Sequence, residues 1–97
     1  MEKYPYLNEA VACILSRRRN ALAMSKRKLS EEAMIERAYI SSLEAGRKCP
    51  TLNVLFYICE ALDMSPVEFM TELMKEIRRF GDAVQKQNRK DAQENGL

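Results

Sequence analysis

The side chains of this sequence with the widest chemical range are its three cysteines, Cys13, Cys49 and Cys59. They form no close pair, and the chain contains no histidine that could complete a zinc site. Cys13 and Cys59 fall at apolar positions of helical patterns, where a cysteine packs as a small hydrophobic residue. Cys49, between Lys48 and Pro50, could be a reactive thiol. We predict no metal site and no cofactor.

Catalytic machinery is also absent from the sequence. There is no histidine, no glycine-rich phosphate loop and no cluster of carboxylates in an evident pocket. The N-terminus lacks a basic start followed by an apolar run, and no window approaches the roughly 18 apolar residues that a membrane span needs. We therefore expect a cytoplasmic protein that is neither an enzyme nor a membrane protein.

The charges are divided between two regions, although the net charge is only +2. Residues 17–28 carry six positive charges and no negative one, whereas residues 52–77 carry one lysine and five acidic residues. A charge run is often only a solvated face, but this asymmetry suits a module that sets one basic end against phosphate. The pattern favours a nucleic-acid partner.

Helical periodicity runs through almost the whole chain, and no alternating stretch is long enough to predict a sheet. A chain of 97 residues has room for one domain. We predict an all-α fold in which residues 8–80 form the domain and residues 81–97 a flexible polar tail.

Capping residues and apolar spacing set the predicted helix boundaries. Asn8 is expected to cap the first helix, Ser25 the second, and a capping box over residues 65–68 the fifth. Gly46 is expected to stop the third helix, and Gly81 the fifth. The five predicted helices cover approximately residues 8–22, 26–34, 37–45, 52–62 and 66–81.

Residues 26–45 are the most informative segment. Two short helical patterns are joined there by a turn too short to let them lie antiparallel, which is the geometry of a helix-turn-helix. The outward face of the second of these helices presents Arg37, Ala38, Ser41 and Ser42. A helix that enters the major groove needs a short polar face, because bulky apolar side chains would hold it away from the base edges. The alternative is an ordinary solvent-exposed helix.

Residues 15–70 resemble the Cro/repressor type of helix-turn-helix, also called the xenobiotic response element family. Its members pair an arginine late in the first helix with a glutamate at the end of the recognition helix, and Arg19 and Glu44 stand at the matching positions. The segment from Glu44 to Thr51 resembles the family's Glu-x-Gly-basic-basic-x-Pro-Ser motif. This resemblance implies a five-helix, lambda-repressor-like DNA-binding domain in which Arg19 and Glu44 form a structural ion pair.

Within that family, the run Arg37-Ala38-Tyr39-Ile40-Ser41 is similar to the Arg-Thr-Tyr-Ile-Ser of restriction-modification controller proteins and related short repressors. The resemblance implies a transcriptional regulator that acts as a homodimer on a palindromic operator in double-stranded DNA. The alternative function is that of an antitoxin or adaptor whose main partner is another protein, docked on the fifth helix or the tail.

The chain departs from the family pattern at two positions where glycine is usual, Met34 in the turn and Asp63 after the fourth helix. Both positions are expected to need a positive φ, where a residue other than glycine costs about 1 kcal/mol. We expect these departures to lower stability rather than to change the fold.

The proposed base-reading residues are Arg37, Ala38, Ser41 and Ser42. Arg37 can bind guanine O6 and N7 in a bidentate contact, and its alternative role is a phosphate contact. Ala38 could touch a thymine methyl group and Ser42 a base edge, or either could only provide clearance.

Four residues are predicted to contact the DNA phosphates: Lys26, Tyr39, Arg47 and Lys48. The alternative is solvated surface for the three cations and partial packing for Tyr39. The other cations of residues 17–28 are expected mainly to add to the general positive field.

A dimer interface is predicted from Phe56, Tyr57, Met70 and Met74, because the last two helices offer more apolar surface than a lone core needs. The competing interpretation places these side chains in the core.

Overall fold

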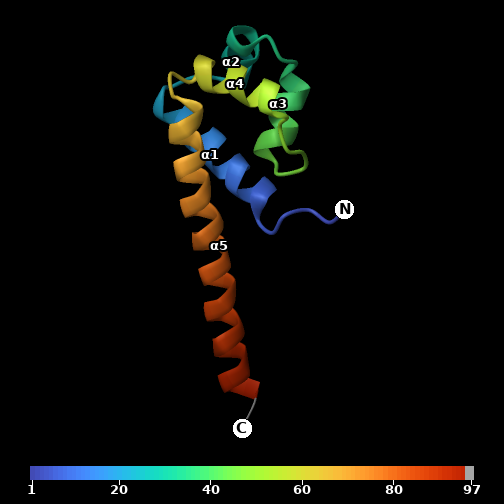
Figure 1. Ribbon diagram of the computed structural model, residues 1–97, viewed down its shortest axis with the longest axis vertical. Helices are drawn as coiled ribbons and strands as arrows, with labels where there is room; N and C mark the ends of the chain where they lie inside the picture. Colours follow the sequence, from blue (N-terminus) through green and yellow to red (C-terminus); the bar gives the residue numbers. More distant parts are fainter. Residues whose placement is uncertain (96–97) are drawn as a thin grey trace.

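The computed structural model of the chain describes residues 1–95, which contain five helices and no strand (Figure 1). The helices are α1 (Leu7–Ala21), α2 (Lys26–Ala33), α3 (Arg37–Glu44), α4 (Leu52–Ala61) and α5 (Pro66–Asn95). The predicted all-α class is confirmed. The first four helices gather at one end of the molecule, and α5 runs from this group along the long axis (Figure 1).

Side-chain caps begin two of the helices as the sequence predicted. The hydroxyl of Ser25 accepts a hydrogen bond from the backbone N–H of Lys28 at 3.0 Å at the start of α2. At the start of α5, the N–H of Glu68 donates to the Ser65 hydroxyl at 3.0 Å, and the N–H of Ser65 donates to the Glu68 carboxylate at 3.4 Å. These bonds satisfy N–H groups that have no partner within the helix.

The start of α1 differs from the prediction. The helix begins after Tyr6, which adopts φ 63°, and no side chain caps it. Asn8, the predicted cap, lies inside the first turn and is only 8% exposed. The ring of Tyr6 stacks on Phe80 of α5 with the ring centroids 6.4 Å apart. This aromatic packing, rather than an N-cap, holds the chain where it enters α1.

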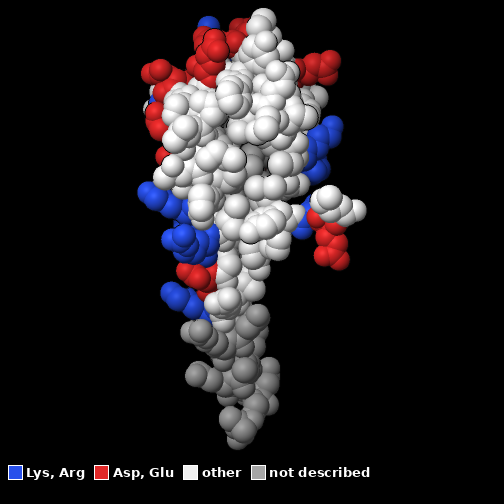
Figure 2. Space-filling view, in the orientation of Figure 1, with Lys and Arg blue, Asp and Glu red and all other residues white. Residues whose placement is uncertain are grey.

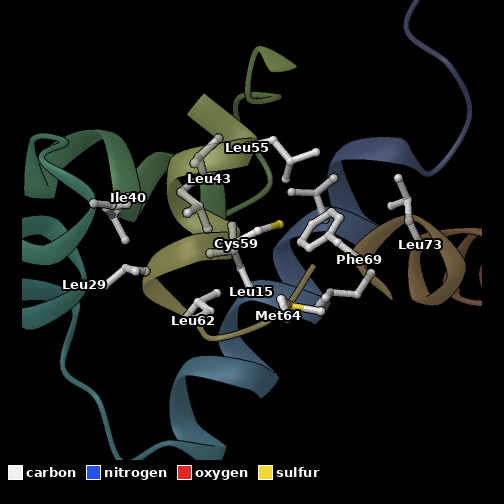
Figure 3. Close-up of a cluster of buried hydrophobic side chains, with 14 of the residues drawn as sticks. Leu15, Leu29, Ile40, Leu43, Leu55, Cys59, Leu62, Met64, Phe69 and Leu73 are labelled. Atoms are coloured by element: carbon white, nitrogen blue, oxygen red, sulfur yellow. The ribbon is translucent and has the colours of Figure 1, made fainter. Parts of the chain in front are cut away.

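The hydrophobic core joins all five helices (Figure 3). Ile40 and Leu43 attach α3 to it and are fully buried. Figure 3 shows Leu29 of α2 beside Ile40, and Phe69 of α5 at the opposite side of the cluster. Burying one such side chain contributes roughly 1.5–3 kcal/mol. The largest fully buried side chains are Ile14, Leu15, Leu29, Ile40, Leu43, Ile58, Cys59, Leu62 and Phe69.

The last helix is longer than predicted. We expected it to end near Gly81, but α5 continues to Asn95. Gly46 is the only glycine of residues 1–95 with a positive φ, so Gly81 keeps a helical backbone. The predicted helix end at Gly81 is therefore wrong: residues 82–95 continue the helix, and they contain no glycine or proline and many good helix formers. Residues 96–97 of the predicted tail lie outside the described chain.

The projecting part of α5 gives the molecule its elongated shape. A helix of 30 residues is about 45 Å long, and the principal-axis extents are 56 × 24 × 23 Å. Among the side chains that the structure describes, Phe80 is the last residue of α5 that packs against the core. The remaining turns of the helix extend beyond the other four helices (Figure 1).

Within residues 1–95, four residues other than glycine adopt a left-handed backbone: Tyr6, Ala23, Met34 and Asp63. Met34 (φ 57°) and Asp63 (φ 52°) are the two positions where the sequence predicted a positive φ, and that prediction is confirmed. At each of these positions, a residue other than glycine lowers the free energy of unfolding by about 1 kcal/mol, because its Cβ atom crowds the following carbonyl oxygen.

Ala23 provides a test of this strain, because only a methyl group is removed when it becomes glycine. We expect Ala23→Gly to raise the free energy of unfolding by about 1 kcal/mol, since glycine has no steric penalty at φ 52°. Ala45 is the matched control: it is also exposed, but its φ is −86°. Ala45→Gly should lower the same quantity by about 0.5–1 kcal/mol. Urea unfolding measures both, and equal destabilisation by both variants would contradict the assignment of strain.

Candidate nucleic-acid interface

The turn between α2 and α3 is fixed by backbone and side-chain hydrogen bonds. The N–H of Ile35 donates to the carbonyl of Ser30 at 3.1 Å. The hydroxyl of Ser30 donates to the carbonyl of Ile35 in return. Between them, Met34 adopts a left-handed backbone that changes the direction of the chain, and this residue is 77% exposed. The turn therefore sets α3 in a defined position relative to α2.

The outer face of α3 presents the four residues predicted to read bases. Arg37 and Ala38 are exposed, while Ser41 and Ser42 are half-buried. No salt bridge holds Arg37 among the side chains that the structure describes, those of residues 1–87. The structure therefore brings a free guanidinium, a methyl group and two hydroxyls onto one short helix face.

The four residues predicted to contact phosphate lie around this helix. Lys26 is the first residue of α2 and is half-buried, and Arg47 and Lys48 are exposed in the loop after α3. The ammonium of Lys48 lies 5.4 Å from the centroid of the Tyr39 ring, a cation–π contact. Tyr39 itself is half-buried and packs against the core. The partial packing considered for Tyr39 is thus present.

A buried ion pair joins α1 to the end of α3. The Nε of Arg19 lies 2.7 Å from one carboxylate oxygen of Glu44, and an Nη lies 2.8 Å from the other. The hydroxyl of Ser16 also donates to Glu44 at 2.7 Å, and Arg19 donates to the Met24 carbonyl at 2.8 Å. The side chains of Arg19 and Glu44 are only 12% and 5% exposed. The predicted pair is therefore a bidentate contact whose remaining polar groups are also bonded.

These hydrogen bonds control the ionisation of Glu44. Burial by itself raises the pKa of a carboxyl, but the hydrogen bonds from Arg19 and Ser16 and the charges of Arg19 and Lys26 hold the pKa of Glu44 below its usual value. The carboxylate is consequently ionised at neutral pH, as the pair requires.

Two of the arginines expected to add to the positive field serve the fold instead. Arg17 lies 2.9 Å from Glu76 and 3.4 Å from Glu72 of α5. Arg18 donates to the carbonyl of Leu62 at 2.9 Å and to that of Asp63 at 2.8 Å. Arg17 thus ties α1 to α5, and Arg18 caps the carbonyl end of α4. The sequence showed a basic run but not the distant groups that each side chain would meet.

Arg27 and Lys28 are also paired. They lie 3.2 Å from Glu31 and 3.3 Å from Glu32 respectively, each one turn further along α2. All four side chains are well exposed, so these pairs are weak and salt-sensitive. The i,i+4 spacing was visible in the sequence and could have predicted them.

The four predicted interface side chains are exposed on the single chain: Phe56 (58%), Tyr57 (45%), Met70 (44%) and Met74 (64%). Such exposure excludes the competing interpretation that they are extra core. Met70 and Met74 are one turn apart on α5, so they lie on the same side of the helix.

Two of the three cysteines have thiols that are harder to ionise than an ordinary thiol. Desolvation by the surrounding protein raises the pKa of the Cys49 thiol, and burial raises that of Cys59 to about 11. The side chains that the structure describes, those of residues 1–87, include no cluster of three or more potential metal ligands. No helix within residues 1–95 is long and apolar enough to cross a membrane.

Comparison with known proteins identifies the type of domain. A family profile described as helix-turn-helix matches residues 15–69. No curated protein sequence matches the chain.

Two solved structures of the restriction-modification controller protein C.Esp1396I are similar to this chain. The wild-type structure shares 28% identity over 80% of this chain and 99% of that chain, with a TM-score of 0.71. The second is its tetramer in complex with a natural 35-base-pair operator, with 29% identity over 78% and 97% of the two chains and a TM-score of 0.69.

The clp gene regulator ClgR from Corynebacterium glutamicum covers more of the chain. It shares 25% identity over 98% of this chain and 100% of that chain, with a TM-score of 0.80. The similarity therefore extends over the long α5 as well as the first four helices.

Because of the ion pair of Glu44, the free energy of unfolding should depend on pH in the acid range. Because the folded pKa lies below the unfolded value of about 4.3, ionised Glu44 stabilises the fold above that pH, and this contribution is lost as pH falls through the folded pKa. We expect the unfolding free energy of the wild type to fall more steeply than that of Glu44→Gln below about pH 5.

The arginine partner can be tested at neutral pH. At pH 7, Arg19→Ala should lower the free energy of unfolding by about 3–5 kcal/mol, because it leaves a buried carboxylate unpaired.

Chemical denaturation at a series of pH values measures both effects. Glu76, which is paired with Arg17, is unchanged in both proteins, so its contribution cancels in the comparison. Identical acid slopes for the wild type and Glu44→Gln would contradict the proposed role of Glu44.

Proposed function

The chain belongs to the helix-turn-helix family, and on this premise we propose that it is a sequence-specific transcriptional regulator. It binds a palindromic operator in double-stranded DNA as a homodimer. The observation that carries this proposal is the outer face of α3: a free, exposed Arg37 at the start of a short polar face, on a helix whose other side is fixed to the core by Ile40 and Leu43.

Base reading is assigned to the residues on this face. Arg37 lies in the first turn of α3, which enters deepest into the major groove in this type of motif. Its guanidinium binds guanine O6 and N7, a contact worth about 1–3 kcal/mol of discrimination. Ala38 contacts a thymine methyl group, and Ser41 and Ser42 offer hydroxyls to neighbouring base edges.

Lys26, Tyr39, Arg47 and Lys48 bind phosphates on either side of the groove. Lys26 combines its cation with the backbone N–H groups at the start of α2. The contact between Lys48 and the Tyr39 ring supports a joint role, because it orients both side chains beside α3. Arg47 adds a second cation from the same loop.

The similar proteins support this proposal. C.Esp1396I is a controller protein whose structure was solved on its operator, and ClgR is a gene regulator. Solved variants of C.Esp1396I replace an arginine, a threonine and a tyrosine that are successive in its chain. Arg37, Ala38 and Tyr39 follow the same order here, with alanine in place of threonine. We propose that the protein acts in the cytoplasm as a repressor, by occupying an operator near a promoter.

The homodimer rests on the exposed apolar side chains of α4 and α5. Phe56, Tyr57, Met70 and Met74 have no partner in the single chain that would remove them from water. A second copy that covers them through a two-fold axis presents two α3 helices to the DNA. The half-sites would then lie about 34 Å apart, or a multiple of that spacing.

Selection of bound sites from random duplex DNA tests the base readers. We expect an enriched palindrome, and we expect Arg37→Ala to lower affinity for it by about 1–3 kcal/mol while relaxing specificity at one base pair of each half-site. Arg47→Ala is the control for a phosphate contact: it should weaken binding to all duplexes and reduce the salt slope by about 1 per subunit. No enriched sequence and no salt-dependent binding would refute the proposal.

The dimer is tested by placing a charge in its interface. Met74→Asp should yield a folded monomer whose DNA affinity falls at least about tenfold, because the interface would have to bury an unpaired carboxylate. Met34→Asp is the control for the added charge, since Met34 is also an exposed methionine (77%, against 64% for Met74) and lies outside α4 and α5. Light scattering at moderate salt measures the mass of each protein. A Met74→Asp protein that remains dimeric would contradict this interface.

A further inference from the structure

The outer face of α5 has charged side chains at the spacing of a helix-pairing seam. Counting from Glu68, charged residues recur after four and three positions in alternation, which places them along one side of a helix. The six residues are Glu68, Glu72, Lys75, Arg79, Asp82 and Lys86. This side flanks α1, because Glu72 pairs with Arg17 and Arg79 donates to Cys13. It is distinct from the side that carries Met70 and Met74.

The signs of these charges separate along the helix. A shallow hollow of about 270 Å³ at the start of α5 is lined by Glu60, Asp63 and Glu68 among others. A second hollow, of about 410 Å³, lies further along α5 and is lined mainly by basic side chains, Lys75, Arg78, Arg79 and Lys86. Figure 2 shows acidic side chains gathered over the upper edge of the molecule and basic ones below them on the same side.

We propose that this face pairs with the same face of a second copy, with the two α5 helices antiparallel. In one register Glu72 of each copy faces Lys75 of the other, and Glu68 faces Arg79. The acidic hollow of one copy then meets the basic hollow of the other twice, through a two-fold axis. The occupant of this surface is therefore a second copy of the chain, selected by charge complementarity.

Neighbouring registers of the two helices place like charges opposite each other. Sliding the second helix by one heptad in one direction sets Lys75 opposite Arg79 and Glu72 opposite Asp82. Sliding it by one heptad in the other direction sets Glu68 opposite Glu72. Like charges that face each other directly are unfavourable, so only one register of the seam satisfies its charges.

The two ends of the seam fit the same register. Asp82 falls opposite Ser65 of the second copy, at the N-terminus of its α5, where the helix dipole favours a negative charge. Lys86 falls beside the C-terminal end of the other copy's α4, near Glu60 and Asp63. The helix dipole therefore favours the position of Asp82, and the acidic side chains favour that of Lys86.

The contact is weak and depends on salt. Glu72 and Arg79 have side chains that are 43% and 67% exposed, and each already contacts a charged neighbour within its own chain. Exposed ion pairs contribute little individually and are screened by salt. The face thus serves molecules that are already held close together, such as dimers on adjacent DNA sites. Because it is separate from the side of Met70 and Met74, it can link dimers into larger assemblies.

Sedimentation velocity of the full chain at low and high salt tests this inference. At about 0.05 M salt we expect the wild type to form species larger than the dimer, and at about 0.5 M salt these should dissociate. Lys75→Glu should lower the association constant at least tenfold. Lys3→Glu makes the same charge change at another exposed lysine and should have little effect.

The double variant Glu72→Lys with Lys75→Glu exchanges the two charges and should restore association. Its fold is checked by thermal unfolding, because Glu72 also contacts Arg17. Equal association of Lys75→Glu and Lys3→Glu, or no salt-sensitive assembly of the wild type, would overturn the proposal and show that these charges are only solvated. At about 0.05 M salt, Met74→Asp should still form a pair through this face, and the pair should dissociate to the monomer at moderate salt. This result would separate the contact from the apolar dimer and from DNA binding.

Discussion

The ion pair between Arg19 and Glu44 is the contact on which the proposed interface depends. It joins the end of α1 to the end of α3 through two short hydrogen bonds, and the hydroxyl of Ser16 bonds the same carboxylate. Ile40 and Leu43 hold the inner side of α3 in the core, but apolar contacts alone allow a helix to slide or rotate. The bidentate geometry fixes the last turn of α3, and the bonded turn at Met34 fixes its start. The outer face is thereby preorganised.

Much of this arrangement could be predicted from the sequence, because it depends on local rules or on a specific family pattern. Ser25 and Ser65 cap their helices as expected, and Met34 and Asp63 adopt the positive φ expected where the family has glycine. The pairing of Arg19 with Glu44 followed from their positions in the pattern. Local spacing and a long motif are properties of the sequence itself.

The predictions for Asn8 and Arg17 failed because of contacts between distant residues, whereas that for Gly81 failed because of its neighbours in the helix. Asn8 had the residue type of a cap, but the stacking of Tyr6 on Phe80 moved the start of α1 and buried Asn8 instead. Gly81 had the residue type of a helix stop, yet the good helix formers on both sides carry α5 through it. Arg17 belonged to a basic run, but its partner Glu76 lies in another helix. Residue type alone does not show which of these tertiary contacts forms.

The proposed interface places α3 of each subunit in the major groove with Arg37 on a guanine. Methylation of guanine N7 adds a methyl group in that groove and blocks an arginine contact there. Methylation interference on a selected operator should show loss of binding at one guanine in each half-site, related by two-fold symmetry, and Arg37→Ala should be insensitive to methylation at these positions. Interference that is absent, or that Arg37→Ala leaves unchanged, would contradict the account.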